Sequence, residues 1–231
     1  MSDSIFPILI ESTQEEKAVF YKKTYLHVAF SILTFILLES ILVKIVPEDV
    51  IIGMMGSRMT WLAIIGGFWL LSMVANKFTM MADRNMQYAG LGLYILIESI
   101  IFLPMIYMAM FFSGGGVEML TQAALITLFL FSGLTAVAFL SKKDFSFLRT
   151  GIIVGGFISL GLIVVGALFG FNLGLAFSVG MVVLAGASIL YQTSQLIHKY
   201  QTDQYVGASL ELFASIMLLF WYVLRILSSR K

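Results

Sequence analysis

The stretch Thr150–Phe169 reads TGIIVGGFISLGLIVVGALF and carries no charged side chain. A helix that crosses the hydrocarbon core of a bilayer needs about 20 predominantly apolar residues, which is the length of this stretch. Because hydrocarbon offers the backbone no hydrogen-bond partner, a segment that spans it must satisfy its own backbone as a helix. The stretch therefore predicts a transmembrane α-helix.

Six further apolar runs, bounded by charged residues, Gly or Pro, extend this pattern along the chain. Segments of about ten residues with alternating polarity, the signature of a membrane β-barrel, do not occur. We therefore predict an all-α integral membrane protein with seven transmembrane helices in one domain of residues 24–231, preceded by an N-terminal tail of residues 1–23. The expected spans are Thr24–Val46, Arg58–Ala75, Tyr88–Phe112, Met119–Leu140, Thr150–Phe169, Leu173–Ile197 and Gly207–Leu227.

The composition excludes several other classes of protein. Of the 231 residues, 60% are hydrophobic and 12% are charged, whereas a soluble domain is about 45–50% apolar and about 25% charged. A formal net charge of +1 gives no electrostatic basis for binding nucleic acid. The sequence contains no cysteine, which excludes a disulfide framework, a thiolate nucleophile and a cysteine metal site. We expect no cofactor, and the bilayer itself as the first partner.

The distribution of basic residues predicts the orientation, because cytoplasmic flanks carry the excess of Lys and Arg. We place the N-terminus in the cytoplasm and the C-terminus outside, although the basic C-terminus argues the other way. The 14 Lys and Arg residues divide between Lys17, Lys22, Lys23, Lys77, Arg84, Lys142, Lys143, Arg149 and Lys199 on the N-terminal side, and Lys44, Arg58, Arg225, Arg230 and Lys231 on the opposite side.

Three acidic residues, Glu39, Glu98 and Glu211, lie inside predicted spans. An acid at the centre of a membrane helix costs about 2.5–3.5 kcal/mol, so each is expected to face protein or water. Pairing with Lys44 or snorkelling would explain Glu39. Glu98 precedes Pro104 by six residues, and since a proline can kink a helix, this span is predicted to bend around a polar pocket with a structural or a functional role.

Two polar stripes occupy the last two spans at helical spacing. If they face each other, they form a hydrogen-bonded interior, which is either polar glue between helices or an ion or proton site. Calcium prefers six to eight oxygens, several of them from carboxylates, so no metal site is predicted around one acid. The stripes comprise Glu211, Ser215 and Tyr222 on the last span and Ser188, Gln192 and Gln195 on the span before it. The candidate polar core or ion path consists of six residues: Glu211, Gln192, Ser215, Ser188, Gln195 and Glu98.

The chain is not expected to be an enzyme, and no catalytic residue is assigned. The two histidines, His27 and His198, lie near span ends and cannot form an H-E-x-x-H zinc site. Serine proteolysis inside the membrane would need a histidine at depth, and aspartyl proteolysis would need paired aspartates, which the predicted spans lack. The last span has no lysine for a retinal Schiff base.

Two segments resemble the bacterial YccA-like branch of the Bax inhibitor-1 family. Residues 140–148, LSKKDFSFL, are similar to its fourth connection, and residues 189–198, ILYQTSQLIH, to its sixth helix. The resemblance is specific from about residue 135 onward and implies six helices around a central seventh. The residues at family-motif positions are Lys143, Asp144, Phe147, Tyr191, Gln192 and Thr193.

The resemblance implies two functions. In the YccA-like branch the protein is a partner, substrate and inhibitor of the membrane-anchored AAA protease FtsH, which pulls on the N-terminal tail; this implies a place in the bacterial inner membrane. Elsewhere in the family, two aspartates on helices six and seven form a pH-sensitive gate for calcium leak. Here those positions fall on Gln192 and near Ser215, neither of which titrates in the physiological range.

We therefore expect a modulator of an FtsH-type protease that acts through the tail and the loop around Lys142–Asp144. A calcium or proton leak protein is the alternative, with Glu211, Gln192 and Glu98 lining the path. A structural subunit of a larger membrane complex remains a third interpretation.

Overall fold

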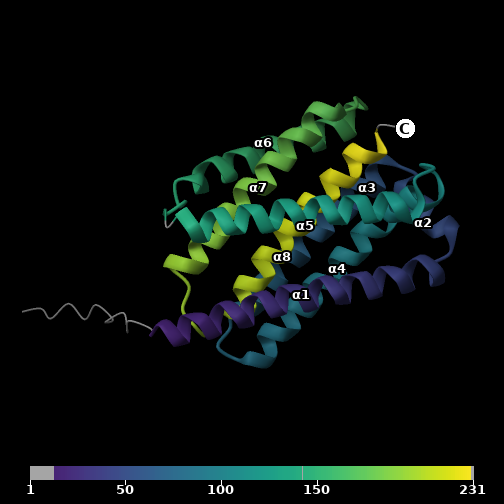
Figure 1. Cartoon of the computed structure of the whole chain (residues 1–231). Coiled ribbons are helices and arrows are strands. Elements are labelled where there is room, and N and C mark those ends of the chain that lie inside the picture. The colour runs from purple at the N-terminus through teal and green to yellow at the C-terminus, as the bar shows by residue number, and fades with distance from the viewer. Residues whose placement is uncertain (1–12, 142, 230–231) are drawn as a thin grey trace, which may run out of the picture.

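The computed structural model describes residues 13–141 and 143–229, and within them every regular element is an α-helix (Figure 1). Seven of the helices, all except α2, are long and apolar enough to cross a membrane, which confirms the predicted all-α class. The helices are α1 (Gln14–Ile45), α2 (Glu48–Met55), α3 (Arg58–Thr79), α4 (Arg84–Phe111), α5 (Gly116–Ser141), α6 (Leu148–Phe169), α7 (Gly174–His198) and α8 (Tyr205–Ser228).

The first helix begins earlier than the apolar run predicts. A capping box fixes its start: the Thr13 hydroxyl accepts from the Glu16 backbone N–H at 3.2 Å, and the Glu16 carboxylate accepts from the Thr13 N–H at 2.7 Å. Residues 14–23, predicted as tail, are therefore helical, while residues 1–12 lie outside the described residues. The eight-residue helix α2 was not predicted, because it is too short to give a span signal.

The last helix, α8, lies at the centre of the bundle and contacts α1, α3, α4, α5 and α7. It supplies many of the most deeply buried apolar side chains, among them Leu212, Phe213 and Leu219. Helix α4 is a second inner helix, which contacts α1, α2, α3, α5 and α8. By contrast, α3 and α6 are mostly exposed, as expected of helices that face hydrocarbon.

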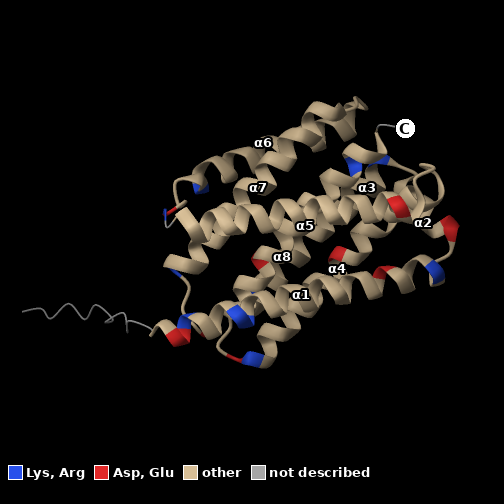
Figure 2. Ribbon diagram, in the orientation of Figure 1, with Lys and Arg blue, Asp and Glu red and all other residues tan. Residues whose placement is uncertain are grey.

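The bundle has two polar ends, and charged residues gather at both (Figure 2). We call the end that holds the start of α1 and the α3–α4, α5–α6 and α7–α8 connections the N-terminal end, and the opposite end the C-terminal end (Figure 1). Between the ends the outer surface is apolar, and large side chains such as Phe129 and Phe157 point outward with 81% and 73% exposure. This surface suits contact with lipid tails.

Candidate functional site

The two polar stripes meet at one hydrogen bond between α7 and α8. The Ser215 hydroxyl donates to the Gln192 side-chain oxygen at 2.8 Å. Ser215 is buried and Gln192 is half-buried. Neither group carries a charge, so this contact, which we call the neutral lock, joins the two helices through a hydrogen bond that does not change with proton binding.

The other residues of the stripes have different partners. The Ser188 hydroxyl donates to the Leu184 carbonyl within α7 at 3.0 Å. The Gln195 amide donates to the Ser146 hydroxyl in the α5–α6 connection at 2.9 Å. The polar residues of α7 therefore form separate contacts, of which the one between Gln192 and Ser215 joins the two stripes.

Glu211 meets a residue that the sequence analysis did not single out. The Tyr200 side chain, in the α7–α8 connection, lies beside the Glu211 carboxyl group. Burial raises the pKa of the Tyr200 phenol well above its usual range, and the neighbouring Glu211 charge raises it further. Glu211, the only carboxyl group of the two stripes, thus has the Tyr200 phenol as its neighbour near the N-terminal end of the bundle.

Glu39 and Glu98 are both buried on inner faces of their helices. Neither carboxylate oxygen of Glu39 has a hydrogen-bond partner among the described residues, and no ion pair with Lys44 is found there, which contradicts the pairing considered from sequence. The Glu98 carboxyl lies beside the Tyr94 hydroxyl, and its Oε2 has no partner within the described chain. Helix α4 continues through Pro104 without ending.

A large cavity lies against α3, α4, α6 and α8 and has a volume of about 950 Å³. Of the six candidate core residues, Glu98 and Ser215 line it, whereas Gln192, Glu211, Ser188 and Gln195 do not. The structure therefore brings together Glu98 on α4 and the serine of the neutral lock, a combination that helical spacing within one span could not reveal. Aromatic side chains form much of the wall: Trp61, Phe68, Tyr94, Phe102, Trp221 and Tyr222.

The α5–α6 connection is fastened to the end of α7 by a group of hydrogen bonds that we call the loop clasp. Asp144 Oδ1 accepts from the Ser146 hydroxyl at 2.6 Å and its backbone N–H at 2.8 Å, and also from the Ser194 hydroxyl at 3.3 Å. Ser194 in turn accepts from the Phe145 N–H at 2.9 Å, and Lys199 donates to Ser146 at 2.8 Å. The Ser146 hydroxyl and N–H hold the pKa of the Asp144 carboxyl below its usual range.

The loop clasp contains one of the six family-motif residues, Asp144. Its neighbours Lys143 and Phe147 are exposed at the N-terminal end, whereas Lys142 lies outside the described residues. On α7, Thr193 is buried and Tyr191 is half-buried. Sequence analysis missed Ser146 and Ser194; the Asp-x-Ser spacing, typical of a side-chain-to-backbone turn, was the signal for Ser146.

The clasp also brings a serine, a histidine and an aspartate together, but not in a catalytic arrangement. His198 Nδ1 lies 2.9 Å from the Ser194 carbonyl oxygen and 3.5 Å from its hydroxyl. Because a carbonyl can only accept, a hydrogen bond to it requires the proton on Nδ1, and in that tautomer Nδ1 has no lone pair to take a proton from the Ser194 hydroxyl. Within the described residues, no three His, Cys, Asp or Glu side chains form a metal-binding group.

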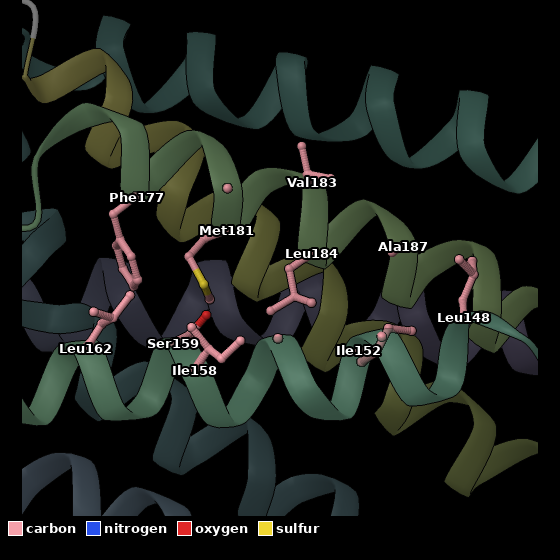
Figure 3. Close-up of a pocket in the computed structure, with 13 residues that line it drawn as sticks. Leu148, Ile152, Ile158, Ser159, Leu162, Phe177, Met181, Val183, Leu184 and Ala187 are labelled. Atoms are coloured by element: carbon pink, nitrogen blue, oxygen red, sulfur yellow. The ribbon is translucent and has the colours of Figure 1, made fainter.

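A second cavity of about 370 Å³ lies between α6 and α7 (Figure 3). Its labelled side chains are apolar except for Ser159, which points toward Met181. Gly155 serves the packing of these helices, since a Cβ atom there would lie 2.8 Å from the Leu184 side chain. The cavity offers no charged group to a ligand.

The fold and the site define a polytopic helical membrane protein whose α7–α8 contact is held by an uncharged hydrogen bond. The family model described as "Inhibitor of apoptosis-promoting Bax1" matches residues 17–231. The chain therefore belongs to this family, the Bax inhibitor-1 family.

Three relatives show how widely the family is distributed. An uncharacterized protein of Pseudomonas aeruginosa is 38% identical over 53% of this chain and 55% of its own length. The Golgi anti-apoptotic protein of vaccinia virus is 34% identical over 48% of this chain and 47% of its own. Protein lifeguard 4 of mouse is 34% identical over 49% of this chain and 48% of its own. The chain thus spans about half the length of the curated relatives it matches.

Proposed function

We propose that this chain is a YccA-like protein of the bacterial inner membrane that binds a membrane-anchored AAA protease of the FtsH type and modulates it as substrate and inhibitor. In this arrangement the N-terminus faces the cytoplasm and the C-terminus lies outside. The proposal rests on the resemblance of residues 140–148 and 189–198 to that branch. The matched bacterial relatives are compatible with it.

The observation that favours this function over ion leak is the neutral lock. A gate that opens with pH needs a group whose charge changes near the working pH, and neither the Gln192 amide nor the Ser215 hydroxyl does so. An interhelical hydrogen bond in a membrane contributes about 0.6 kcal/mol on average, and up to ~1.7 kcal/mol. The lock therefore adds a small stabilisation between α7 and α8 that does not depend on pH, which is compatible with a bundle that resists extraction.

The surface for the protease would be the N-terminal end of the bundle. The start of α1 lies at this end, together with the α5–α6 connection (Figure 1). The loop clasp holds that connection in place while Lys143 and Phe147 stay exposed, Phe147 by 72%. A segment fastened by hydrogen bonds that exposes a cation and an aromatic side chain offers a protein partner a rigid contact at low entropic cost.

The test is co-purification of an FtsH-type protease with tagged protein from native membranes. A deletion of residues 2–12 retains the Thr13 cap, so α1 keeps its start. A variant in which the same residues become Gly and Ser is the matched control for length. We expect protease with the wild type and the Gly/Ser variant, and little with the deletion. Equal recovery from all three, or recovery from none, would overturn the proposal.

One observation favours the alternative, a calcium or proton leak. Glu98 presents an unpartnered carboxylate oxygen beside a cavity that Ser215 also lines. The leak function predicts calcium or proton flux in liposomes above that of empty vesicles, and loss of this flux in Glu98→Gln. A variant Glu118→Gln, altered at an exposed acid at the start of α5, is the control. Wild-type flux equal to that of empty vesicles would exclude it.

A further inference from the structure

We propose that the large cavity binds one anionic phospholipid, with the headgroup phosphate at Arg58 and Arg225 and an acyl chain along the aromatic wall. This inference does not depend on the protease function. It assigns a ligand to the cavity between α3, α4, α6 and α8.

The two arginines supply the charge complementarity. Arg58 is the first residue of α3 and Arg225 lies in the last turn of α8, so both line the cavity at the C-terminal end of the bundle. Neither guanidinium has a hydrogen bond or an ion pair within residues 13–141 and 143–229. A guanidinium recognises phosphate through paired hydrogen bonds, which makes a phosphate group the fitting partner.

The backbone is shaped to hold Arg58 at this place. Gly170 ends α6 in the left-handed conformation, with φ at 78°, and the Arg58 guanidinium lies against it. Any Cβ at Gly170 would collide with that guanidinium. A side chain at position 170 would therefore be disfavoured twice, by the left-handed backbone and by the collision with Arg58. Gly170 in this way leaves room for the Arg58 guanidinium at the mouth of the cavity.

The size and walls fit a lipid chain. A volume of about 950 Å³ is at the upper end of the range of pockets for organic ligands, about 300–1,000 Å³. The wall includes Trp61, whose ring stacks on Trp221 with centroids 6.2 Å apart. Helices α3 and α6, which form two of the walls, are the two most exposed spans, so lipid surrounds the site.

The uneven distribution of charge in the cavity sets the direction of the ligand. The Glu98 carboxyl is buried near the middle of α4, and one of its oxygens has no partner in the described chain. Among the described residues, the only basic ones that line the cavity are the two arginines, so an anionic group is attracted to their end and finds no positive charge beside Glu98. The headgroup therefore lies at the arginines and the chain extends toward the middle of the membrane.

Tryptophan fluorescence can test this binding directly. The sequence has three tryptophans, and Trp69 is exposed outside the cavity, so a Trp69→Phe background leaves Trp61 and Trp221 as reporters. Delipidated protein in detergent is titrated with phosphatidylglycerol that carries brominated chains, which quench a nearby indole. Phosphatidylcholine with the same chains and soluble glycerol phosphate provide the comparison arms.

We expect saturable quenching by phosphatidylglycerol at lower mole fraction than by phosphatidylcholine. Arg58→Gln and Arg225→Gln should each weaken it about fivefold, the equivalent of ~1 kcal/mol per basic residue, while Arg149→Gln at the opposite end changes nothing. Ala167→Phe, which fills the cavity from α6, should abolish saturation without loss of thermal stability.

Three results would overturn the proposal. One is equal quenching by the two lipids, and another is an Arg149→Gln effect equal to that of Arg58→Gln. The third is full competition by glycerol phosphate, which would show a site for a free anion and no role for the acyl chain.

Discussion

Gly90 lies where α3 and α4 approach closely, and its replacement by Ala tests the packing that positions Glu98. A methyl group built at Gly90 would lie 2.6 Å from the Ala75 carbonyl oxygen and 2.8 Å from the Phe78 Cβ atom. A backbone oxygen cannot rotate away, so the helices must separate, at a cost of about 1–3 kcal/mol for overpacking. Against this, Ala gains about 0.5–1 kcal/mol over Gly inside a helix.

The matched control is Gly92→Ala, two residues along the same helix, where a Cβ atom would meet nothing within 4 Å. Both variants share the gain in helix propensity, so the difference between them isolates the collision. We expect Gly90→Ala to have a free energy of unfolding lower than Gly92→Ala by about 1–3 kcal/mol. The assay is reversible unfolding of purified protein in mixed micelles, followed by circular dichroism. A Gly90→Ala protein as stable as Gly92→Ala would refute this packing.

Three further predictions address the neutral lock, the loop clasp and the core. A double-mutant cycle of Ser215→Ala and Gln192→Met should give a coupling of about 0.6 kcal/mol, up to ~1.7 kcal/mol, in the same unfolding assay; zero coupling would contradict the lock. The pKa of Asp144 in the folded protein is lower than its ordinary value of 3.8, so the ionised carboxylate stabilises the folded loop at pH values above 3.8. This stabilisation is lost as the pH falls through the lower pKa of the folded state. Exchange of the Ser146 amide should therefore be faster in Asp144→Ala at neutral pH, measured by hydrogen exchange, and the same rate in both proteins would count against the clasp. Phe213→Ala, which empties a fully buried site on α8, should cost about 3–5 kcal/mol of unfolding free energy, and a loss below 1 kcal/mol would show that α8 is not the centre of the core.

The spans could be predicted from sequence because the bilayer imposes one requirement on all of them. Each must be about 20 residues of mostly apolar character. Every predicted span accordingly lies within one of the seven long helices, apart from a single terminal residue in each of three spans. The same criterion could not detect α2, whose eight residues are too few to span, nor the start of α1 at Gln14, which a capping box fixes among polar residues. Hydropathy measures burial in lipid and carries no information on helices outside it.

The polar site was predicted less completely, and the reason is geometric. Helical spacing placed Glu211 and Ser215 on one face of α8, yet Ser215 meets Gln192 while Glu211 meets Tyr200. Spacing gives the angle of a side chain around its own helix but not the depth or rotation of the helix opposite. The partner of Gln195 shows the same limit, because Ser146 lies 49 residues away in a connection.

The sequence by itself determined that this protein spans a membrane with seven helices, because an unsatisfied backbone cannot remain in hydrocarbon. It also determined that the two positions where other members of the family carry a pair of aspartates are occupied by uncharged residues, Gln192 and Ser215. Tertiary structure alone decided which helix faces turn inward, because lipid tails are as apolar as helix side chains and hydropathy does not distinguish a lipid contact from a helix contact. The cavity exists only where four helices meet, and that meeting places Glu98 and two arginines from the ends of two helices around one volume.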